Sequence, residues 1–411
     1  MFEPTGMGAS MFRALFLLMS LGSCLCHLSL ASEFFAAEIQ ASNKEQRTKI
    51  TTLGVAIDRV SPDSVHAVIT HHEKRILERQ KVKFKAYAIA ESRLHEQAFF
   101  GPPTGFRDYD QSHAALESVA AKYPKIAKVL SLGKSLEGRD IWAIRLSSNP
   151  IDDSLPTAVF LGCHHAREYL SAEVPLRLAE HLADHYGTDP IIQNLLDHRE
   201  VWIAPVINPD GLQYDLTKPG TLYWRKNRRF LGKYFGSDVF GVDLNRNYDA
   251  GWSLPGASAD PLSPVYHGPN PFSEPETKAI RDFIEKRKRA TVLLTYHSFS
   301  ELVLWPYGYT YDQVQNSADR LVFEWMGKKM AADLKYKPMK ISELYLASGE
   351  TTDWAYDKHR IFGFTFELSP RSFSEGGFYP NTSLIDQVFK DNIKPALFLV
   401  DKAENPYSIL K

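Results

Sequence analysis

The chain has 411 residues, of which 44% are hydrophobic and 24% are charged. This composition excludes disordered and fibrous proteins and is typical of a soluble globular protein with a large core. The formal net charge of -1 gives no overall field that would attract nucleic acid, so we expect no nucleic-acid partner. The length favours one large or two medium domains.

The first 31 residues have the pattern of an export signal. A basic residue precedes an apolar stretch, and small residues follow at Ser29 and Ala31. This order predicts a signal peptide over residues 1–31, cleaved near Ala31, and a secreted or periplasmic protein with no membrane span after cleavage. A single membrane anchor is the alternative, because the stretch approaches the length that spans a bilayer. The LGSC motif ending at Cys24 also resembles a bacterial lipoprotein site, which would anchor the protein through Cys24.

Residues 32–103 form a separate α+β segment that is too small to hold the main core. Apolar stretches at 53–57, 65–69 and 82–89 predict three strands, and residues 72–80 predict a helix. The sequence Pro-Pro-Thr-Gly at 102–105 predicts a linker. We therefore expect the main domain to cover residues 104–405.

Helical and strand patterns alternate through this main domain. Strands are predicted at 141–146, 158–163, 201–207, 292–296 and 362–368, and helices at 112–123, 171–186, 275–285, 318–335 and 384–403. Pro175 sets the start of the second helix near Ser171, because proline is best tolerated in a first turn. The alternation predicts an α/β fold, a mixed and mostly parallel twisted sheet flanked by helices on both faces.

A metal-binding pattern begins at His165, directly after a predicted buried strand. His165 and Glu168 are three residues apart, so both side chains can reach one divalent ion, and zinc accepts nitrogen and oxygen donors. His297 ends another apolar strand and supplies a third donor, although one such histidine alone could be structural. Three protein donors with a fourth position open to water are typical of a catalytic site. We therefore predict one Zn2+ held by these three residues.

A candidate base and candidate anion-binding residues follow. Glu367 stands in an otherwise apolar strand, where an acid is costly unless it faces a polar cavity or a metal. It is a candidate general base, or else a salt-bridged strand residue. Arg225 and the pair Asn245-Arg246 lie in polar loops and could bind carboxylates, or be ordinary surface residues. Asp243 could accept a hydrogen bond from a metal-binding histidine and orient it.

Together these motifs resemble the zinc metallocarboxypeptidases of the carboxypeptidase A/B type. The matching segments are HARE at 165–168, NPDG at 208–211, YWRK at 223–226, GVDLNRNYDAG at 241–251, YHGP at 266–269, SEPET at 273–277, HSFSELVLWPYGY at 297–309, YLASGETTDW at 345–354 and FTFEL at 364–368. They have the family's order and spacing and span nearly all of residues 106–403. As a set they are far more specific than any one of them.

The resemblance implies how each residue would act. His165, Glu168 and His297 would bind zinc, and Glu367 would be the general base for a zinc-activated water. Arg225 would stabilise the oxyanion formed at the scissile carbonyl.

The resemblance also implies a substrate, the C-terminus of a peptide or protein. Asn245 and Arg246 would bind the terminal carboxylate, and Tyr345 would close over it. Arg167 would contact the substrate further from the scissile bond.

The pocket for the C-terminal side chain departs from the animal enzymes. Thr352 occupies the position that separates apolar from basic-selective pockets in the family. Glu350 replaces a small residue, and related bacterial enzymes with an acid there accept both kinds of residue. We therefore expect mixed apolar and basic preference. If Glu350 points away, the pocket is apolar instead.

Three alternatives remain open at this stage. The segment 32–103 resembles the extensions of some secreted bacterial members, either an activation peptide that covers the cleft or a retained accessory domain. A cell-wall peptidase of the same fold, acting on peptidoglycan stem peptides, would share the zinc site. A non-catalytic peptide-binding member is the third. The leading interpretation is an exported, monomeric zinc metallocarboxypeptidase.

Overall fold

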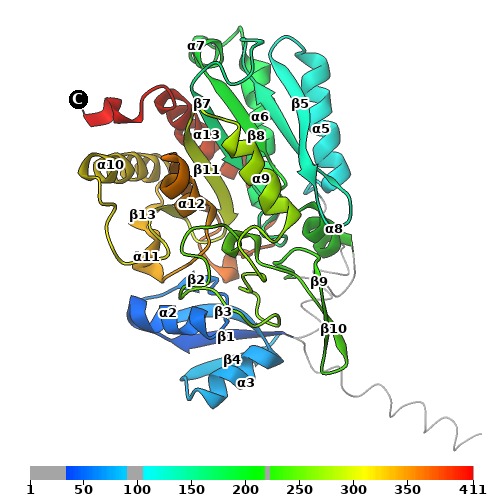
Figure 1. Cartoon of the computed structure of the whole chain (residues 1–411), viewed down its shortest axis with the longest axis vertical. Coiled ribbons are helices and arrows are strands. Elements are labelled where there is room, and N and C mark those ends of the chain that lie inside the picture. Colours follow the sequence, from blue (N-terminus) through cyan, green and yellow to red (C-terminus); the bar gives the residue numbers. More distant parts are fainter. Residues whose placement is uncertain (1–33, 90–104, 218–222, 411) are drawn as a thin grey trace, which may run out of the picture.

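The computed structural model describes residues 34–89, 105–217 and 223–410. The predicted signal peptide, Cys24 and nearly all of the predicted linker lie outside the described residues. Within them, a small N-terminal domain lies at one end of a larger α/β domain (Figure 1). No helix in this part of the chain combines the length and the apolar character needed to cross a membrane.

An eight-stranded mixed sheet runs through the larger domain (Figure 1). Its order is β13-β12-β14-β11-β7-β8-β6-β5. The strands are β5 (Ala127–Lys134), β6 (Asp140–Leu146), β7 (Thr157–Leu161), β8 (Glu200–Ala204), β11 (Ala290–Ser298), β12 (Leu302–Trp305), β13 (Lys337–Lys340) and β14 (Phe362–Leu368). The central strands β14, β11, β7 and β8 pair in parallel, whereas β6 and β12 pair with them antiparallel. The predicted mixed, mostly parallel sheet is confirmed.

Helices cover both faces of this sheet, which is why its central strands are almost wholly buried. The larger domain contains α5 (Tyr109–Lys122), α6 (Tyr169–His185), α7 (Pro190–His198), α8 (Pro209–Thr217), α9 (Pro275–Glu285), α10 (Ser317–Leu334), α11 (Ile341–Leu344), α12 (Thr351–His359) and α13 (Leu384–Lys402). Neighbouring side chains of β7 enter opposite cores: Phe160 packs with the core that contains α6 and α13, and Val159 with the core that contains α9 and α12. A separate hairpin is formed by β9 (Phe230–Tyr234) and β10 (Ser237–Phe240).

The ten elements predicted in the larger domain are all present, with one local error. Helix α6 begins at Tyr169, so Pro175 lies in its second turn and not in its first. Proline cannot donate to the carbonyl of Ser171 four residues earlier. That carbonyl lies against Gly162, where a Cβ would come within 2.1 Å of the Ser171 oxygen. The glycine therefore makes room for a helix that starts earlier than the proline suggested.

The N-terminal domain is a four-stranded sheet of order β2-β3-β1-β4 with two helices. Its elements are β1 (Phe34–Gln40), α2 (Lys44–Thr52), β2 (Arg59–Val60), β3 (Ser64–Thr70), α3 (His71–Arg79) and β4 (Phe84–Ala88). The strand predicted at 53–57 is wrong. This stretch begins at the C-cap of α2 and forms most of the loop before β2, and its apolar residue Val55 is buried in the domain's own core without joining a strand.

Glu73 is a buried acid at the start of α3. Its Oε2 accepts hydrogen bonds from the backbone and the hydroxyl of Thr70, and its Oε1 has no partner among the described residues. Burial raises the pKa of Glu73 from 4.5 to about 7. Between these two values the folded state binds more protons than the unfolded state. The free energy of unfolding therefore falls as pH rises through this window.

The variant Glu73→Gln tests this effect, because glutamine copies the protonated acid. We expect the wild-type N-terminal domain to lose up to about 3 kcal/mol of unfolding free energy between about pH 5 and pH 8 relative to the variant. Denaturant titrations at both pH values measure the difference. Glu78→Gln, on the same helix but half exposed, is the matched control. Equal pH dependence in wild type and Glu73→Gln would contradict the argument.

Candidate active site

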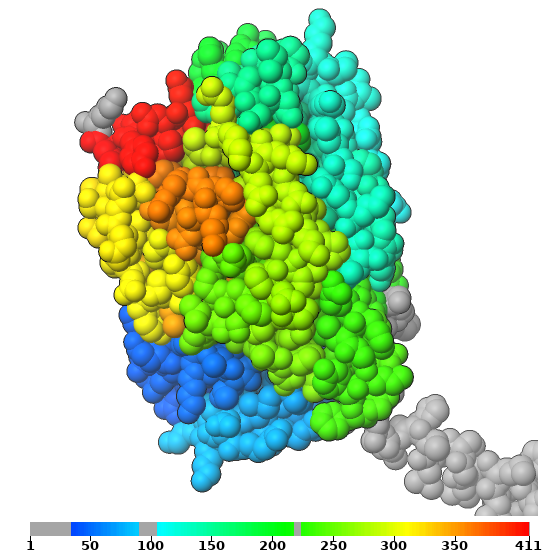
Figure 2. Space-filling model, viewed as in Figure 1, coloured from blue at the N-terminus to red at the C-terminus, as the bar shows by residue number. Residues whose placement is uncertain are grey.

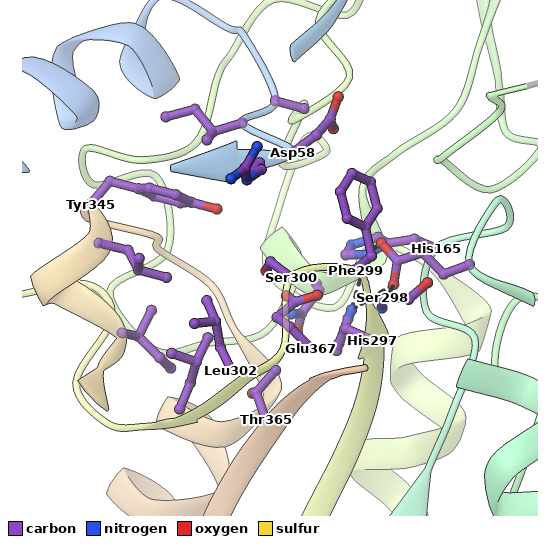
Figure 3. Close-up of a pocket in the computed structure, with 18 of the residues that line it drawn as sticks. Asp58, His165, His297, Ser298, Phe299, Ser300, Leu302, Tyr345, Thr365 and Glu367 are labelled. Carbon is purple, nitrogen blue, oxygen red and sulfur yellow. Dashed lines mark hydrogen bonds and ion pairs between the residues drawn. The ribbon is translucent and has the colours of Figure 1, made fainter. Parts of the chain in front are cut away.

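One cavity lies between the carboxyl ends of the central strands and the N-terminal domain (Figure 3). Most of the predicted site residues line it: His165, Glu168, Arg225, Asn245, Arg246, His297, Tyr345, Glu350 and Glu367. The parallel pairing of β7, β11 and β14 explains this meeting, because parallel strands end at the same edge of a sheet.

His165, Glu168 and His297 form a compact group of metal donors. The Nδ1 atom of His165 is 2.8 Å from Glu168 Oε1, and the Nδ1 atom of His297 is 3.0 Å from Glu168 Oε2. The two Nδ1 atoms are 3.1 Å apart. Donors about 2.0–2.1 Å from a tetrahedral zinc are roughly 3.3 Å from one another, so the group needs little movement to accept the ion. All three side chains are buried, and two imidazoles with one carboxylate fit Zn2+.

Asp243 holds His165 in the form that metal binding needs. The Nε2–H of His165 donates to Asp243 Oδ1 at 3.1 Å, which leaves the lone pair of Nδ1 for the ion. The guanidinium of Arg225 donates to Asp243 Oδ2 from Nε and Nη2, at 3.0 and 2.9 Å. Burial would raise the pKa of Asp243, but Arg225 and His165 outweigh it and hold the pKa well below its ordinary value. The carboxylate therefore stays ionised beside both groups.

Glu367 lies beside the metal donors on β14. It pairs in register with His297 of β11, and its side chain faces the cavity in Figure 3. Burial raises the pKa of Glu367 to about 8, with the carboxylate of Glu168 adding to this and His297 opposing it. A divalent cation at the neighbouring donors would lower it again. Such a carboxyl can exchange a proton near neutral pH.

The residues predicted to bind the terminal carboxylate line the same cavity. Asn245 and Arg246 lie in the short 3-10 helix η1 (Leu244–Arg246), and both are buried. Arg246 Nη1 donates to Glu350 Oε1 at 3.1 Å. Arg225 Nη1 is 3.8 Å from Glu168 Oε1, next to the metal donors. The cavity therefore contains two buried cations, Arg225 beside the metal donor Glu168 and Arg246 beside Glu350.

Two predicted substrate-binding residues are not among those that line the cavity. Arg167 Nη2 donates to Asp58 Oδ1 of the N-terminal domain at 2.7 Å, and its guanidinium lies 3.9 Å from the ring centroid of Phe378. Thr352 is buried in α12, where it packs against Gly363 of β14. Its position in the sequence motif does not show which way a helical side chain points.

The N-terminal domain contributes residues to the cavity. The sequence had allowed an activation peptide over the cleft as one alternative, but it did not identify which residues reach the cavity. Residues 56–60, in the loop that follows α2 and continues into β2, line it opposite the metal donors. Asp58 is the labelled member in Figure 3. Only the docking of two domains brings this loop here, and no motif in residues 53–60 signals it. The close packing of the two domains is visible in Figure 2.

The donor group and the neighbouring Glu367 fit a zinc-dependent hydrolase, and comparisons with known proteins identify the family. The profile of the zinc carboxypeptidase family (peptidase M14) matches residues 112–395. A zinc carboxypeptidase from Saccharothrix mutabilis subsp. capreolus is 31% identical over 94% of this chain and 93% of its own length. Carboxypeptidase A2 of Rattus norvegicus is 36% identical, over 65% of this chain and 63% of the rat protein.

Solved structures share the fold. Carboxypeptidase A from Helicoverpa armigera superposes with a TM-score of 0.77 at 24% identity, over 92% of this chain and 99% of that one. Thrombin-activatable fibrinolysis inhibitor gives a TM-score of 0.71 at 23% identity, over 91% of this chain and 100% of that one. The chain belongs to the zinc carboxypeptidase family. It is a zinc metallocarboxypeptidase, whose substrates are peptide C-termini, and the resemblance found in its sequence is confirmed.

Proposed function

We propose that this chain is an exported, monomeric carboxypeptidase that removes C-terminal residues one at a time, with Glu367 as general base. One observation carries the proposal: a single cavity joins a lone carboxyl, three metal donors and buried cationic side chains. A base, an electrophile and a carboxylate clamp are what hydrolysis next to a free C-terminus requires. Export is inferred from the sequence pattern of residues 1–31 alone.

The residues divide the reaction between them. A zinc ion held by His165, Glu168 and His297 would supply the Lewis-acid chemistry that polarises the scissile carbonyl and lowers the pKa of water. Glu367 takes a proton from the attacking water and passes it to the leaving amine, so the carboxylate is regenerated. Arg225 stabilises the developing oxyanion, a contribution of roughly 3 kcal/mol in comparable sites. Asn245 and Arg246 hold the terminal carboxylate, and Tyr345 closes over it.

The variant Glu367→Gln tests the assignment of the base. We expect kcat to fall about 100- to 10 000-fold, because the proton acceptor is lost, while the bound zinc and the peptide affinity remain. Peptides ending in Phe, Leu, Lys, Arg, Glu and diaminopimelate are incubated with the full chain, before and after limited proteolysis. Mass spectrometry identifies the products, and metal analysis measures the zinc.

The same assay separates the alternatives. A chelator should abolish release of the C-terminal residue from wild type, and added zinc should restore it. Release from the diaminopimelate peptide alone would favour the cell-wall peptidase. Peptide binding without release from any peptide would favour a non-catalytic member. Full activity in Glu367→Gln would show that another group is the base.

We also propose that the pocket accepts both apolar and basic C-terminal side chains. Its walls include Leu302, Leu304 and Ile341, and Glu350 adds a carboxylate. The side chain of Glu350 is 11% exposed and bonded to Arg246, so part of its capacity remains for a cationic substrate. Burial raises the pKa of Glu350 and Arg246 opposes the shift. Lys or Arg in the pocket would oppose it further.

The variant Glu350→Gln keeps the shape of the pocket and removes the charge. We expect kcat/KM for peptides ending in Lys or Arg to fall about 10- to 100-fold relative to peptides ending in Phe or Leu, the loss of a charged hydrogen bond. Thr352→Val is the matched control, since Thr352 does not line the cavity. An unchanged ratio in Glu350→Gln with a changed ratio in Thr352→Val would assign specificity to Thr352.

We propose finally that the N-terminal domain, residues 32–103, is an inhibitory propeptide. Its residues 56–60 line the cavity that also contains Glu367, on the side from which a substrate would approach. Asp58 is paired with Arg167, and each side chain is only 4% exposed. Further bonds join the domains, from Ser263 Oγ to the Gly54 carbonyl at 2.6 Å and between His72 Nε2 and Asp260 Oδ2 at 2.7 Å. Substrate can therefore reach Glu367 only after the N-terminal domain has dissociated or been removed.

The variant Asp58→Asn should weaken this closure. Breaking a buried ion pair costs about 3–5 kcal/mol, so we expect activity of the uncut chain to rise at least about 100-fold. Activity after proteolysis should be unchanged. The control is Asp63→Asn, at an exposed position of the same domain. Equal activity of the cut and uncut wild-type chain would instead favour a retained accessory domain.

A further inference from the structure

A buried hydrogen-bonded chain runs from the metal donors to the carboxylate clamp. Its middle member is His164, which precedes the donor His165 and is fully buried. The ring of His164 lies nearly parallel to that of His297, with centroids 5.7 Å apart. The proposed reaction gives His164 no role, yet both of its ring nitrogens have polar partners.

One side of His164 leads to the metal donor His297. The hydroxyl of Thr295 lies 3.2 Å from His164 Nδ1 and 3.3 Å from His297 Nε2. Thr295 is itself fully buried on β11, two residues before His297. This hydroxyl therefore contacts Nε2 of His297, the ring nitrogen that faces away from the other metal donors.

The other side of His164 leads to Asn245. His164 Nε2 lies 3.0 Å from the hydroxyl of Tyr248 and 3.2 Å from that of Thr351. Thr351 Oγ1 and the Thr351 backbone N–H both donate to Asn245 Oδ1, at 2.8 and 3.0 Å. A backbone N–H can only donate, so the oxygen of the amide must face Thr351. The amide nitrogen of Asn245 is then left for the cavity that Asn245 lines.

Donor and acceptor roles can be assigned along the whole chain in one direction. His297 needs a free lone pair on Nδ1 to bind a metal, so its proton is on Nε2 and is donated to Thr295. Thr295 then donates its own proton to His164 Nδ1. His164 therefore carries its proton on Nε2 and donates to Tyr248 and Thr351, and Thr351 donates to Asn245. The hydroxyls of Thr295 and Thr351 each accept one bond and donate one, and the Nε2–H of His164 is shared between Tyr248 and Thr351.

We propose that His164 is a positioning residue that couples the two halves of the site. It fixes the tautomer of His297 that binds zinc, and through the Thr351 hydroxyl it supports the orientation of the Asn245 amide, whose donor group faces the substrate carboxylate. The inference rests on the proposed carboxylate role of Asn245. The effect of His164 on zinc binding by His297 can be tested without measuring hydrolysis.

The variants Thr295→Val and Thr351→Val each remove one hydroxyl from the hydrogen-bonded chain, on either side of His164, without changing side-chain shape. For Thr295→Val we expect zinc affinity to fall about 10-fold or more, as for other groups that orient a ligand, with KM unchanged at saturating zinc. For Thr351→Val we expect KM to rise about 2- to 10-fold, with kcat and zinc affinity unchanged. Competition with a chelator of known affinity measures zinc on the full chain, and KM is measured on one common preparation.

The matched control is Thr157→Val, another fully buried threonine of the same sheet, whose hydroxyl donates to the Leu155 carbonyl. A purely structural role would make all three variants equally unstable and give no split between zinc affinity and KM. Asparagine and glutamine in place of His164 add a rescue. His164→Asn can keep the bond to Thr295, and with it zinc affinity, and His164→Gln can keep the bond to Thr351, and with it KM.

Zinc affinity within twofold of wild type in Thr295→Val, together with an unchanged KM in Thr351→Val, would overturn the inference. A wild-type chain that binds zinc but releases no C-terminal residue would instead contradict the proposed function. The two failures are thus distinguishable.

Discussion

The pairing of β11 with β7 on one side and β14 on the other is the constraint on which the site depends. Both pairings are parallel, and the register sets His297 directly opposite Glu367. Side chains alternate along a strand, so a slip of one residue would turn Glu367 or His297 to the opposite face of the sheet. The buried backbone cannot relax toward water to permit such a slip, because helices cover both faces. The register of a hydrophobic sheet thus sets the relative position of His297 and Glu367, two of the polar groups that the chemistry needs.

A second constraint is the burial of charge. Glu168 and Asp243 are buried carboxylates, and each would be costly alone. Arg225 lies next to both of them, and His165 donates to Asp243 from Nε2 while its Nδ1 lies 2.8 Å from Glu168 Oε1. These groups form one network, so removing any member leaves another charge unpaired. The arrangement is costly to build, but it holds the donors in place before an ion or a substrate arrives.

The sequence predicted those parts of the molecule that depend on local pattern. Apolar runs of strand length placed β11 and β14 to within two residues, and the polar residues at their ends are the ones that meet in the cavity. The orientation of Thr352 and the partner of Arg167 could not be predicted. Both depend on tertiary packing, of α12 against β14 and of the N-terminal domain against the cavity. The strand predicted at 53–57 was wrong for a related reason. A loop that is buried without pairing to a strand has the same apolar pattern as a strand.

Gly162, at the end of β7, helps to set the position of the metal donor Glu168. The position carries no chemistry, but any Cβ there would collide with the Ser171 carbonyl in the first turn of α6. Glu168 is the residue that caps this helix, so the distance from the end of β7 to Glu168 depends on an absent side chain. A residue with no chemical role therefore helps to set the position of a metal donor. A change there would displace the donor carboxylate while leaving every recognisable motif intact.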